Sequence, residues 1–175
     1  IITSGMLTSE FGLINLEHIE IPAGIEELHN SMVEVTLDNI SSVPFVFIRG
    51  VKTFCKSIDD ADMMRGEESE LVGLSGSLVE NAIYILPGSH SKLIKTDVNG
   101  KITDITTMLT GEMIAAISQG TILKDAVDLE NSQIDDRYLF LGYEYCLENG
   151  FNKAVFKIRV LKNMFSRTKS EVYSF

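Results

Sequence analysis

The chain has 175 residues, of which 45% are hydrophobic and 23% are charged, a composition typical of a globular protein with a real core. Lysine and arginine number 15 against 25 aspartate and glutamate residues, so the formal net charge at neutral pH is −10. Because this charge repels phosphate backbones and anionic lipid surfaces, neither nucleic acid nor a membrane is an expected partner.

Cysteine usage and hydropathy narrow the class further. Cys55 and Cys146 lie far apart without a CxxC motif or a zinc-type histidine cluster, so reduced thiols in a cytoplasm are expected. No apolar run approaches the roughly 20 residues of a membrane-spanning helix, and no signal-peptide pattern is present. The chain opens on Ile1 without an initiator methionine and ends on Phe175 in a helical pattern, which indicates a fragment.

The first half of the chain alternates between strand and helix patterns. The apolar start at residues 1–4 predicts a short strand that runs into a loop rich in Gly, Ser and Thr. A helical pattern follows Pro22, and the continuous apolar run at 43–51 predicts a strand buried on both faces. Strand, helix and strand in this order imply a partly parallel sheet. The helical positions after Pro22 are Ile25, Leu28, Met32 and Val35.

Residues 64–80 again show helical spacing, which Gly73 and Gly76 weaken. A domain boundary is predicted near Asn81, where the pattern changes. Beyond it, three β-rich runs up to residue 109 predict an antiparallel meander. The turns between these runs are Pro87-Gly88-Ser89-His90-Ser91 and Asn99-Gly100, the second being a strong hairpin signal.

Helical patterns predominate after the meander. Thr110 is the predicted N-cap of a helix that carries Glu112 in its first turn, beside the positive end of the helix dipole. From Lys124 on the pattern is helical, with a stop at Asn149-Gly150. The two predicted segments are marked by Tyr138, Leu141 and Tyr145 and by Val155, Ile158 and Leu161.

The string Ser89-His90-Ser91-Lys92 fits the S-x-x-K pattern of β-lactam-binding enzymes, but that chemistry needs a helix to place the lysine, and here a strand follows. The segment instead offers backbone N–H groups, two hydroxyls and a lysine at a tight turn, which can surround a phosphate. An ordinary polar hairpin is the alternative, and His90 alone is typical of a surface residue. No Walker-type or dinucleotide-binding glycine motif is present.

Arg65 stands among three carboxylates, those of Glu67, Glu68 and Glu70. An exposed pair between Arg65 and Glu68 contributes only a few tenths of a kcal/mol, so a solvated helix start is the default interpretation. The alternative is a site that grips a ligand.

Read together, these pieces resemble the 2-dehydro-3-deoxygalactonokinases, sugar-acid kinases of the actin, hexokinase and Hsp70-like superfamily. The family usually has Thr at Ser89, an aromatic residue at Leu93 and Thr-Gln at Ser69-Glu70, and the extra charge of Glu70 leaves the exact sugar acid open. The matching residues lie in order along the chain: Gly5-Met6 with Ser9 and Gly12, Pro22-Ala23, Met64 to Glu68, Pro87 to Lys92, Thr110-Gly111-Glu112 and, less diagnostic, Phe156, Arg159 and Ser170.

The resemblance implies an α/β protein with the ribonuclease-H-like (actin-like ATPase) kinase fold, in which two domains of mixed sheets and helices hold ATP between them. Residues 1–80 would be the C-terminal part of the first domain and residues 81–175 the N-terminal part of the second, both incomplete. The superfamily's first phosphate loop and its adenosine-binding glycine motif have no match here.

The implied activity is transfer of the γ-phosphoryl group of ATP, with Mg²⁺, to the 6-hydroxyl of 2-dehydro-3-deoxy-D-galactonate in galactonate catabolism, with this fragment inactive alone. Arg65 would clamp the substrate carboxylate, because a planar guanidinium pairs with it bidentately. Glu67 or Glu68 would hold sugar hydroxyls or orient Arg65. The implied substrate-binding residues are Gly5, Met6, Ser9, Arg65, Glu67, Glu68 and Glu112. The implied nucleotide-binding residues are Gly88, Ser89, His90, Ser91 and Lys92.

Neither a catalytic base nor a protein ligand of the metal is identified. Two alternatives stay open: another sugar kinase or a non-catalytic sugar or nucleotide sensor of the same superfamily, and a remnant without enzymatic activity. The expected partners are a small sugar acid and ATP, and a homo-oligomer stays open.

Overall fold

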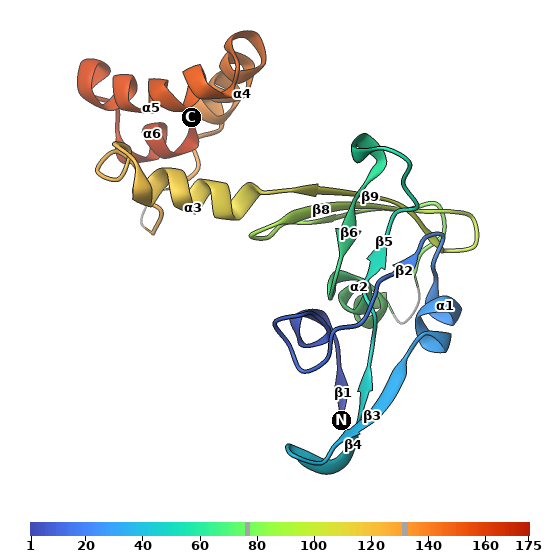
Figure 1. Cartoon of the computed structure of the whole chain (residues 1–175). Coiled ribbons are helices and arrows are strands. Elements are labelled where there is room, and N and C mark those ends of the chain that lie inside the picture. Colours follow the sequence, from blue (N-terminus) through green and yellow to red (C-terminus); the bar gives the residue numbers. More distant parts are fainter. Residues whose placement is uncertain (76–77, 131–132) are drawn as a thin grey trace. The chain divides into compact units, whose positions relative to one another are not determined.

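The computed structural model describes residues 1–75, 78–130 and 133–175 (Figure 1). They form two compact units, residues 1–110 and residues 111–175. The first unit contains three small three-stranded sheets with short helices, and the second is helical. The predicted α/β class with mixed sheets is therefore confirmed. The predicted ribonuclease-H-like domains, with a boundary after residue 80, stay a prediction.

The first sheet has the strand order β1-β4-β3, with β1 at Ile2–Thr3, β3 at Val33–Leu37 and β4 at Ser41–Phe47. Strand β1 pairs with β4 in parallel, which confirms the partly parallel sheet. Strand β3 pairs with β4 in the antiparallel sense. The short 3₁₀ helix η1 at Gly5–Thr8 follows β1 directly.

Two predicted elements of this region are wrong in extent. The helix after Pro22 ends early, since α1 spans only Ile25–Asn30 and the chain then enters β3. Val33 and Val35 are β-branched and pair with Phe47 and Phe45 of β4, so strand pairing decides their conformation.

The run at 43–51 is not a single strand buried on both faces. Strand β4 ends at Phe47, and within it only Phe45 and Phe47 are buried. The two rings stack at 5.7 Å between centroids, on one side of a sheet whose intervening side chains are more exposed. Paired with the antiparallel strand β3, the end of β4 thus alternates buried and more exposed side chains, as in a sheet that is covered on one face only.

The second sheet has the order β2-β5-β6, with β2 at Ile19–Glu20, β5 at Val51–Lys52 and β6 at Met63–Met64. The short 3₁₀ helix η2 at Ile58–Asp60 precedes β6. Helix α2 follows at Glu67–Ser75. The predicted helix at 64–80 therefore starts later than expected, and its residues 76–77 lie outside the described part of the chain.

The third sheet is the predicted antiparallel meander, with β7 at Ile83–Leu86, β8 at Ser91–Thr96 and β9 at Ile102–Met108. The turn at Asn99-Gly100 is confirmed, and Gly100 has φ of +71°. A Cβ atom on Gly100 would lie 2.7 Å from the Leu78 carbonyl oxygen, so the turn needs glycine for space as well as for conformation.

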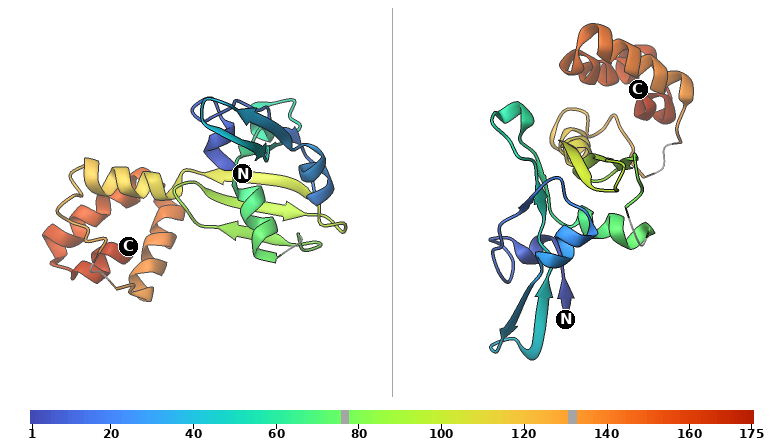
Figure 2. Two further views of the ribbon diagram at one scale, coloured as in Figure 1. Left: turned by 90° about the horizontal axis from the view of Figure 1, so that it is seen from below. Right: turned by 90° about the vertical axis from the view of Figure 1, so that its right-hand side faces the viewer.

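The core of the first unit joins the second and third sheets with α1 and α2 (Figure 2). Ala23 and Ile102 exchange backbone hydrogen bonds of 3.2 and 2.8 Å across this core. The buried side chains are those of Ala23, Leu28, Val51, Met64, Leu71, Leu78, Ile94, Ile102 and Ile105.

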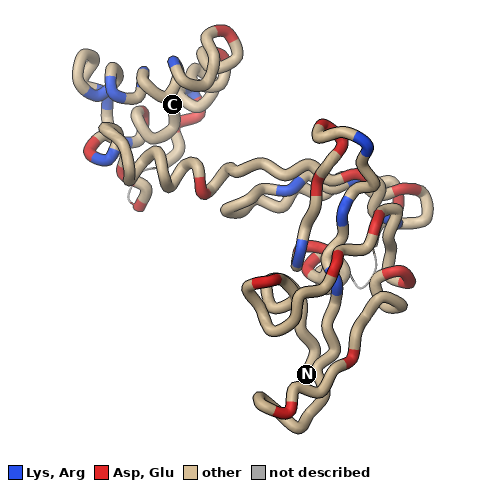
Figure 3. Tube along the Cα trace, viewed as in Figure 1, with Lys and Arg blue, Asp and Glu red and all other residues tan. Residues whose placement is uncertain are grey.

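The helical part comprises α3 at Thr110–Gly120, α4 at Asp136–Asn149, α5 at Phe151–Phe165 and α6 at Lys169–Ser174. The predicted stop is confirmed, because Gly150 separates α4 from α5 with φ of +84°. Basic residues gather along α5 and the segment after it (Figure 3). In the described ranges, no helix is both long and apolar enough to cross a membrane.

Candidate functional site

A glycine turn leads from β6 into α2, and the acidic side chains of the helix fold back onto it. Gly66 has φ of +117°, a conformation that other residues rarely adopt. The Arg65 amide donates to Glu67 Oε2 at 3.0 Å, and the Gly66 amide donates to both Glu68 oxygens at 2.9 Å. Both carboxylates thereby stabilise the positive end of the helix.

Glu68 is fully buried. Burial raises the pKa of Glu68, the neighbouring charge of Glu67 adds to the rise, and hydrogen bonds from Gly66 and Ser69 oppose it. The Ser69 hydroxyl donates to Glu68 Oε1 at 3.2 Å. The second carboxylate of the motif is therefore an internal helix cap without direct access to a ligand.

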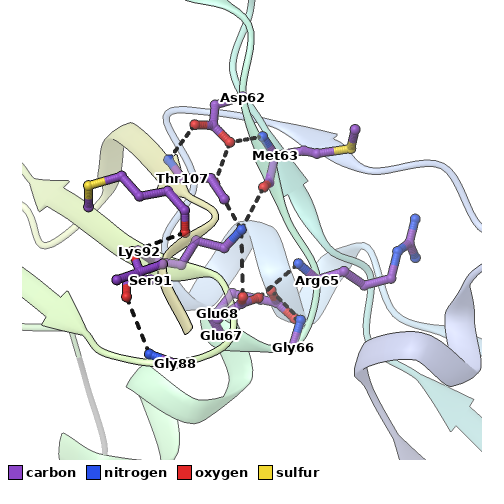
Figure 4. A network of polar contacts seen from close by, with 12 residues as sticks. Asp62, Met63, Arg65, Gly66, Glu67, Glu68, Gly88, Ser91, Lys92 and Thr107 are labelled. Carbon is purple, nitrogen blue, oxygen red and sulfur yellow. Dashed lines mark hydrogen bonds and ion pairs between the residues drawn. The ribbon is translucent and has the colours of Figure 1, made fainter. Parts of the chain in front are cut away.

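The Arg65 side chain points away from these carboxylates (Figure 4). Its Nη1 donates to the carbonyl oxygen of Thr8 and, at 2.7 Å, to the Thr8 hydroxyl. Its Nη2 donates to the Leu16 carbonyl oxygen at 2.9 Å and contacts His18 Nδ1 at 3.2 Å. The default interpretation, a solvated helix start, is thus wrong: Arg65 fastens the loop at residues 5–18. Its predicted role as carboxylate clamp stays a prediction.

The His18 ring that contacts Arg65 Nη2 is neutral. Burial lowers the pKa of His18, and the positive charges of Arg65 and Lys52 lower it further. On its other side the ring packs on Gly50, where a Cβ atom would lie 2.7 Å from His18 Cδ2. The glycine therefore lets β5 approach the loop that Arg65 holds.

A buried lysine connects the arginine motif, residues 64–68, with the predicted phosphate-binding hairpin, residues 87–92 (Figure 4). Lys92 is only 5% exposed. Its Nζ donates to Thr107 Oγ1 at 2.8 Å and to the Met63 carbonyl oxygen at 3.3 Å, and it lies 3.7 Å from Glu67 Oε1. An ammonium group without water needs such partners. The two motifs therefore lie side by side.

Asp62 completes this network. It accepts hydrogen bonds of 2.6 Å from both the amide and the hydroxyl of Thr107, and one of 2.7 Å from the Met63 amide. Sequence reasoning missed Asp62 and Thr107, because the pair joins positions 45 residues apart and neither belongs to a local motif.

The structure confirms the predicted turn at Ser89 and His90, between β7 and β8. Gly88, Ser89 and His90 are exposed, whereas Ser91 and Lys92 are buried. The Gly88 amide makes a long hydrogen bond of 3.4 Å to the Ser91 hydroxyl. Only the tip of the hairpin is therefore accessible to a phosphate, and phosphate binding by these residues stays a prediction.

The structure brings Gly5 directly onto the arginine motif. A Cβ atom on Gly66 would lie 3.3 Å from the Cα atom of Gly5, which itself has φ of +67°. Met6 is exposed, and the Ser9 hydroxyl donates to the Met6 carbonyl oxygen at 2.7 Å. Glu112 lies in the first turn of α3, in the second unit.

Predicted site residues do not line the polar cavity of about 470 Å³ in the first unit. Its walls carry Asp59, Asp60 and Asp62 with Asp104 and the exposed ring of Phe54. In the part of the chain that the structure describes, no group of three His, Cys, Asp or Glu side chains is placed to hold a metal ion.

The whole chain, residues 1–175, matches the sequence model of the family described as 2-keto-3-deoxy-galactonokinase. The chain belongs to this family.

Two curated relatives were found among named proteins. The chain is 31% identical over 114 residues to the 2-dehydro-3-deoxygalactonokinase of Escherichia coli (strain K12). This alignment covers 65% of this chain and 35% of that protein. The chain is 30% identical over 131 residues to a protein of Rhizobium meliloti (strain 1021) named as a probable 2-dehydro-3-deoxygalactonokinase, which covers 73% and 40%. The aligned segments thus span 35% and 40% of the length of these relatives.

A crystal structure from Sinorhizobium meliloti, provisionally named as a 2-dehydro-3-deoxygalactonokinase protein, has a similar fold. The TM-score is 0.78 at 23% sequence identity, and the match covers 98% of this chain and 56% of that one.

Replacing Arg65 tests its role in fastening the loop. Arg65→Lys keeps the charge but lacks the planar fork, so oxygen atoms of Thr8 and Leu16 lose their donor. We expect the free energy of unfolding in urea to fall by about 1–3 kcal/mol. Hydrogen exchange in residues 8–18 should also become faster. The control is Arg137→Lys at an exposed position of α4, and equal behaviour of the two variants would contradict the role.

Glu68→Gln tests the buried carboxylate. Because the folded-state pKa of Glu68 lies above its ordinary value of 4.5, the folded chain holds this proton more tightly than the unfolded chain. Its contribution to stability is complete below the unfolded pKa and is lost as the pH rises through the folded pKa.

Glutamine does not titrate. In urea unfolding between pH 4 and 8, the free energy of unfolding of Glu68→Gln should therefore rise relative to that of the wild type as the pH rises. The gain should be about 1.4 kcal/mol for each unit of raised pKa. Glu70→Gln on the exposed side of α2 is the control. A pH dependence common to the wild type and both variants would refute the raised pKa.

Proposed function

We propose that the protein containing this chain transfers the γ-phosphoryl group of ATP to the 6-hydroxyl of 2-dehydro-3-deoxy-D-galactonate. Membership of the 2-keto-3-deoxy-galactonokinase family supports the reaction class. The observation that carries the proposal is the contact of 3.7 Å between Lys92 Nζ and Glu67 Oε1. It joins the hairpin expected to hold the nucleotide to the motif expected to hold the sugar acid.

Phosphoryl transfer depends mainly on the positioning of the two substrates and on charge stabilisation. On the sugar side, the loop with Gly5, Met6 and Ser9 is held by Arg65 against the start of α2. Glu67 stands at that start with its Oε2 on the Arg65 amide. Arg65 and Glu68 act here as positioning residues, because both Nη atoms of Arg65 and both carboxylate oxygens of Glu68 already have partners within the chain. The substrate-binding role predicted for Glu112, which lies in the second unit, stays a prediction.

On the nucleotide side, Gly88, Ser89 and His90 form the exposed tip of the hairpin, which would receive the outer phosphates. Lys92 and Ser91 stand behind this tip and keep it on β8. Bound Mg²⁺ would neutralise charge on the β- and γ-phosphates, and the described residues provide it with no metal-binding cluster.

The proposal includes the ribonuclease-H-like arrangement, with residues 1–80 and 81–175 contributing to its two domains. It also places the protein in the cytoplasm, with ATP and the sugar acid as its small-molecule partners.

The test is the full-length gene product, assayed for ADP formation with ATP and 2-dehydro-3-deoxy-D-galactonate. We expect ADP release that requires the sugar acid, with a product phosphorylated on the 6-hydroxyl. Ser89→Ala should raise KM for ATP by roughly five- to tenfold, the equivalent of one lost hydrogen bond, and leave KM for the sugar acid unchanged.

The control for this variant is Ser42→Ala, an exposed serine on β4 far from the hairpin in sequence. ADP release without dependence on the sugar acid would refute the proposed function. An equal change of both KM values in Ser89→Ala would refute the nucleotide role of the hairpin.

A further inference from the structure

Arg49 is a second arginine of the first unit, and neither the sequence motifs nor the Lys92 network uses it. It is half-buried, and its Nε atom is buried without a hydrogen-bond partner. In the described residues, no ion pair or hydrogen bond of its guanidinium is present either. The hydroxyl of Thr3, a residue only 9% exposed, is also buried and without a partner.

Unpartnered buried donors are unfavourable, most of all when they belong to a charged group. Native proteins therefore rarely keep such groups unless a ligand or water completes them. One such group in the first sheet and one just after it indicate a place where a ligand can bind.

Thr3 and Arg49 lie at the carboxyl ends of the neighbouring strands β1 and β4. Thr3 ends β1 and is in register with Phe47, the last residue of β4, and the two strands are parallel. The Ile48 amide donates to the Thr3 carbonyl oxygen at 2.9 Å, so Arg49 follows directly after this junction. In open α/β sheets, ligands bind outside the carboxyl ends of parallel strands.

The charges of the first unit also single out Arg49. Ion pairs engage Lys52 with Glu20 at 3.8 Å, Lys95 with Asp104 at 2.6 Å, and Lys101 with Glu27. Lys92 pairs with Glu67, and Arg65 is bound to the loop. Lys56 is exposed to water. Among the described residues of this acid-rich unit (Figure 3), Arg49 is thus the half-buried cation left without an ion pair or a hydrogen bond.

We infer that Arg49 and Thr3 bind the carboxylate of the sugar acid, an inference that rests on the proposed function. The guanidinium can receive the carboxylate bidentately, and the threonine hydroxyl supplies a further donor. The role expected of Arg65 then belongs to Arg49. Arg65 acts as a positioning residue, because it holds His18, which packs on Gly50 next to Arg49.

A nucleotide phosphate is the other anion that this pair could bind. The position favours the carboxylate, because Thr3 precedes the loop of Gly5, Met6 and Ser9 expected to hold the sugar acid. The hairpin expected to hold the nucleotide belongs to the third sheet, β7-β8-β9, which does not include β1 or β4.

The test uses the full-length gene product and calorimetric titration with 2-dehydro-3-deoxy-D-galactonate in the absence of ATP. Arg49→Met removes the charge and keeps most of the stem, and Thr3→Val is nearly isosteric. We expect the affinity for the sugar acid to fall roughly 10- to 100-fold in Arg49→Met and about fivefold in Thr3→Val, with ATP affinity unchanged. Lys56→Met is the matched control and should bind the sugar acid normally.

Two further readouts separate binding from folding. The unfolding temperature without ligand should not fall in Arg49→Met, because the wild-type arginine has no partner to lose. The carboxamide of the sugar acid, which lacks the negative charge, should bind the wild type and Arg49→Met equally.

Each outcome decides. Sugar-acid affinity in Arg49→Met equal to that in Lys56→Met would overturn the inference, and phosphoryl transfer by the wild type would show that the proposed function stands without it. Reduced ATP affinity instead of sugar-acid affinity would overturn the carboxylate assignment. A lower unfolding temperature without ligand would show a structural arginine. Arg49-dependent binding without phosphoryl transfer would support the site and refute the kinase activity.

Discussion

The withdrawal of the Lys92 ammonium from water is the constraint on which the arrangement of the site depends. A buried lysine must find oxygen partners, and these come from β6, from the start of α2 and from β9. One ammonium group therefore fixes the meander against the glycine turn at Gly66. Asp62 strengthens the contact, because it holds Thr107 by both the amide and the hydroxyl.

The Glu67 carboxylate connects Lys92 to Arg65. Its Oε1 faces Lys92 and its Oε2 accepts from the Arg65 amide. With Glu67 and Glu68 both engaged as caps, the Arg65 guanidinium extends the other way and meets the oxygens of the loop. The loop is consequently held at the carboxyl edge of β1, where Thr3 and Arg49 keep donors without partners.

Elements with a local signal could be predicted from the sequence. The meander, the turn at Asn99-Gly100 and the break at Gly150 all follow from residue types that act within a few positions. Strand β3 could not, because Val35 satisfies helical spacing as well as strand alternation until Phe45 is known to be its partner. Propensity is a weak guide where tertiary pairing decides.

The residues of the candidate site divide in the same way. Glycines and carboxylates of the arginine motif were found from their resemblance to a family, and the structure brings them together with Gly5 and Lys92. The direction of Arg65 was not predictable, since its partner Thr8 lies 57 residues away. Arg49 and Thr3 belong to no motif, and only the register of β1 on β4 places them at one edge.

In this account the two arginines have different roles: Arg65 holds the loop at residues 5–18, and Arg49 is proposed to bind the carboxylate of the substrate. A crystal structure of the full-length gene product with the sugar acid bound tests this most directly. The account predicts the carboxylate within about 3.2 Å of the Arg49 guanidinium and the Thr3 hydroxyl, with Arg65 still donating to Thr8. A carboxylate bound to Arg65 with its contact to Thr8 broken, and Arg49 still without an anion, would contradict it.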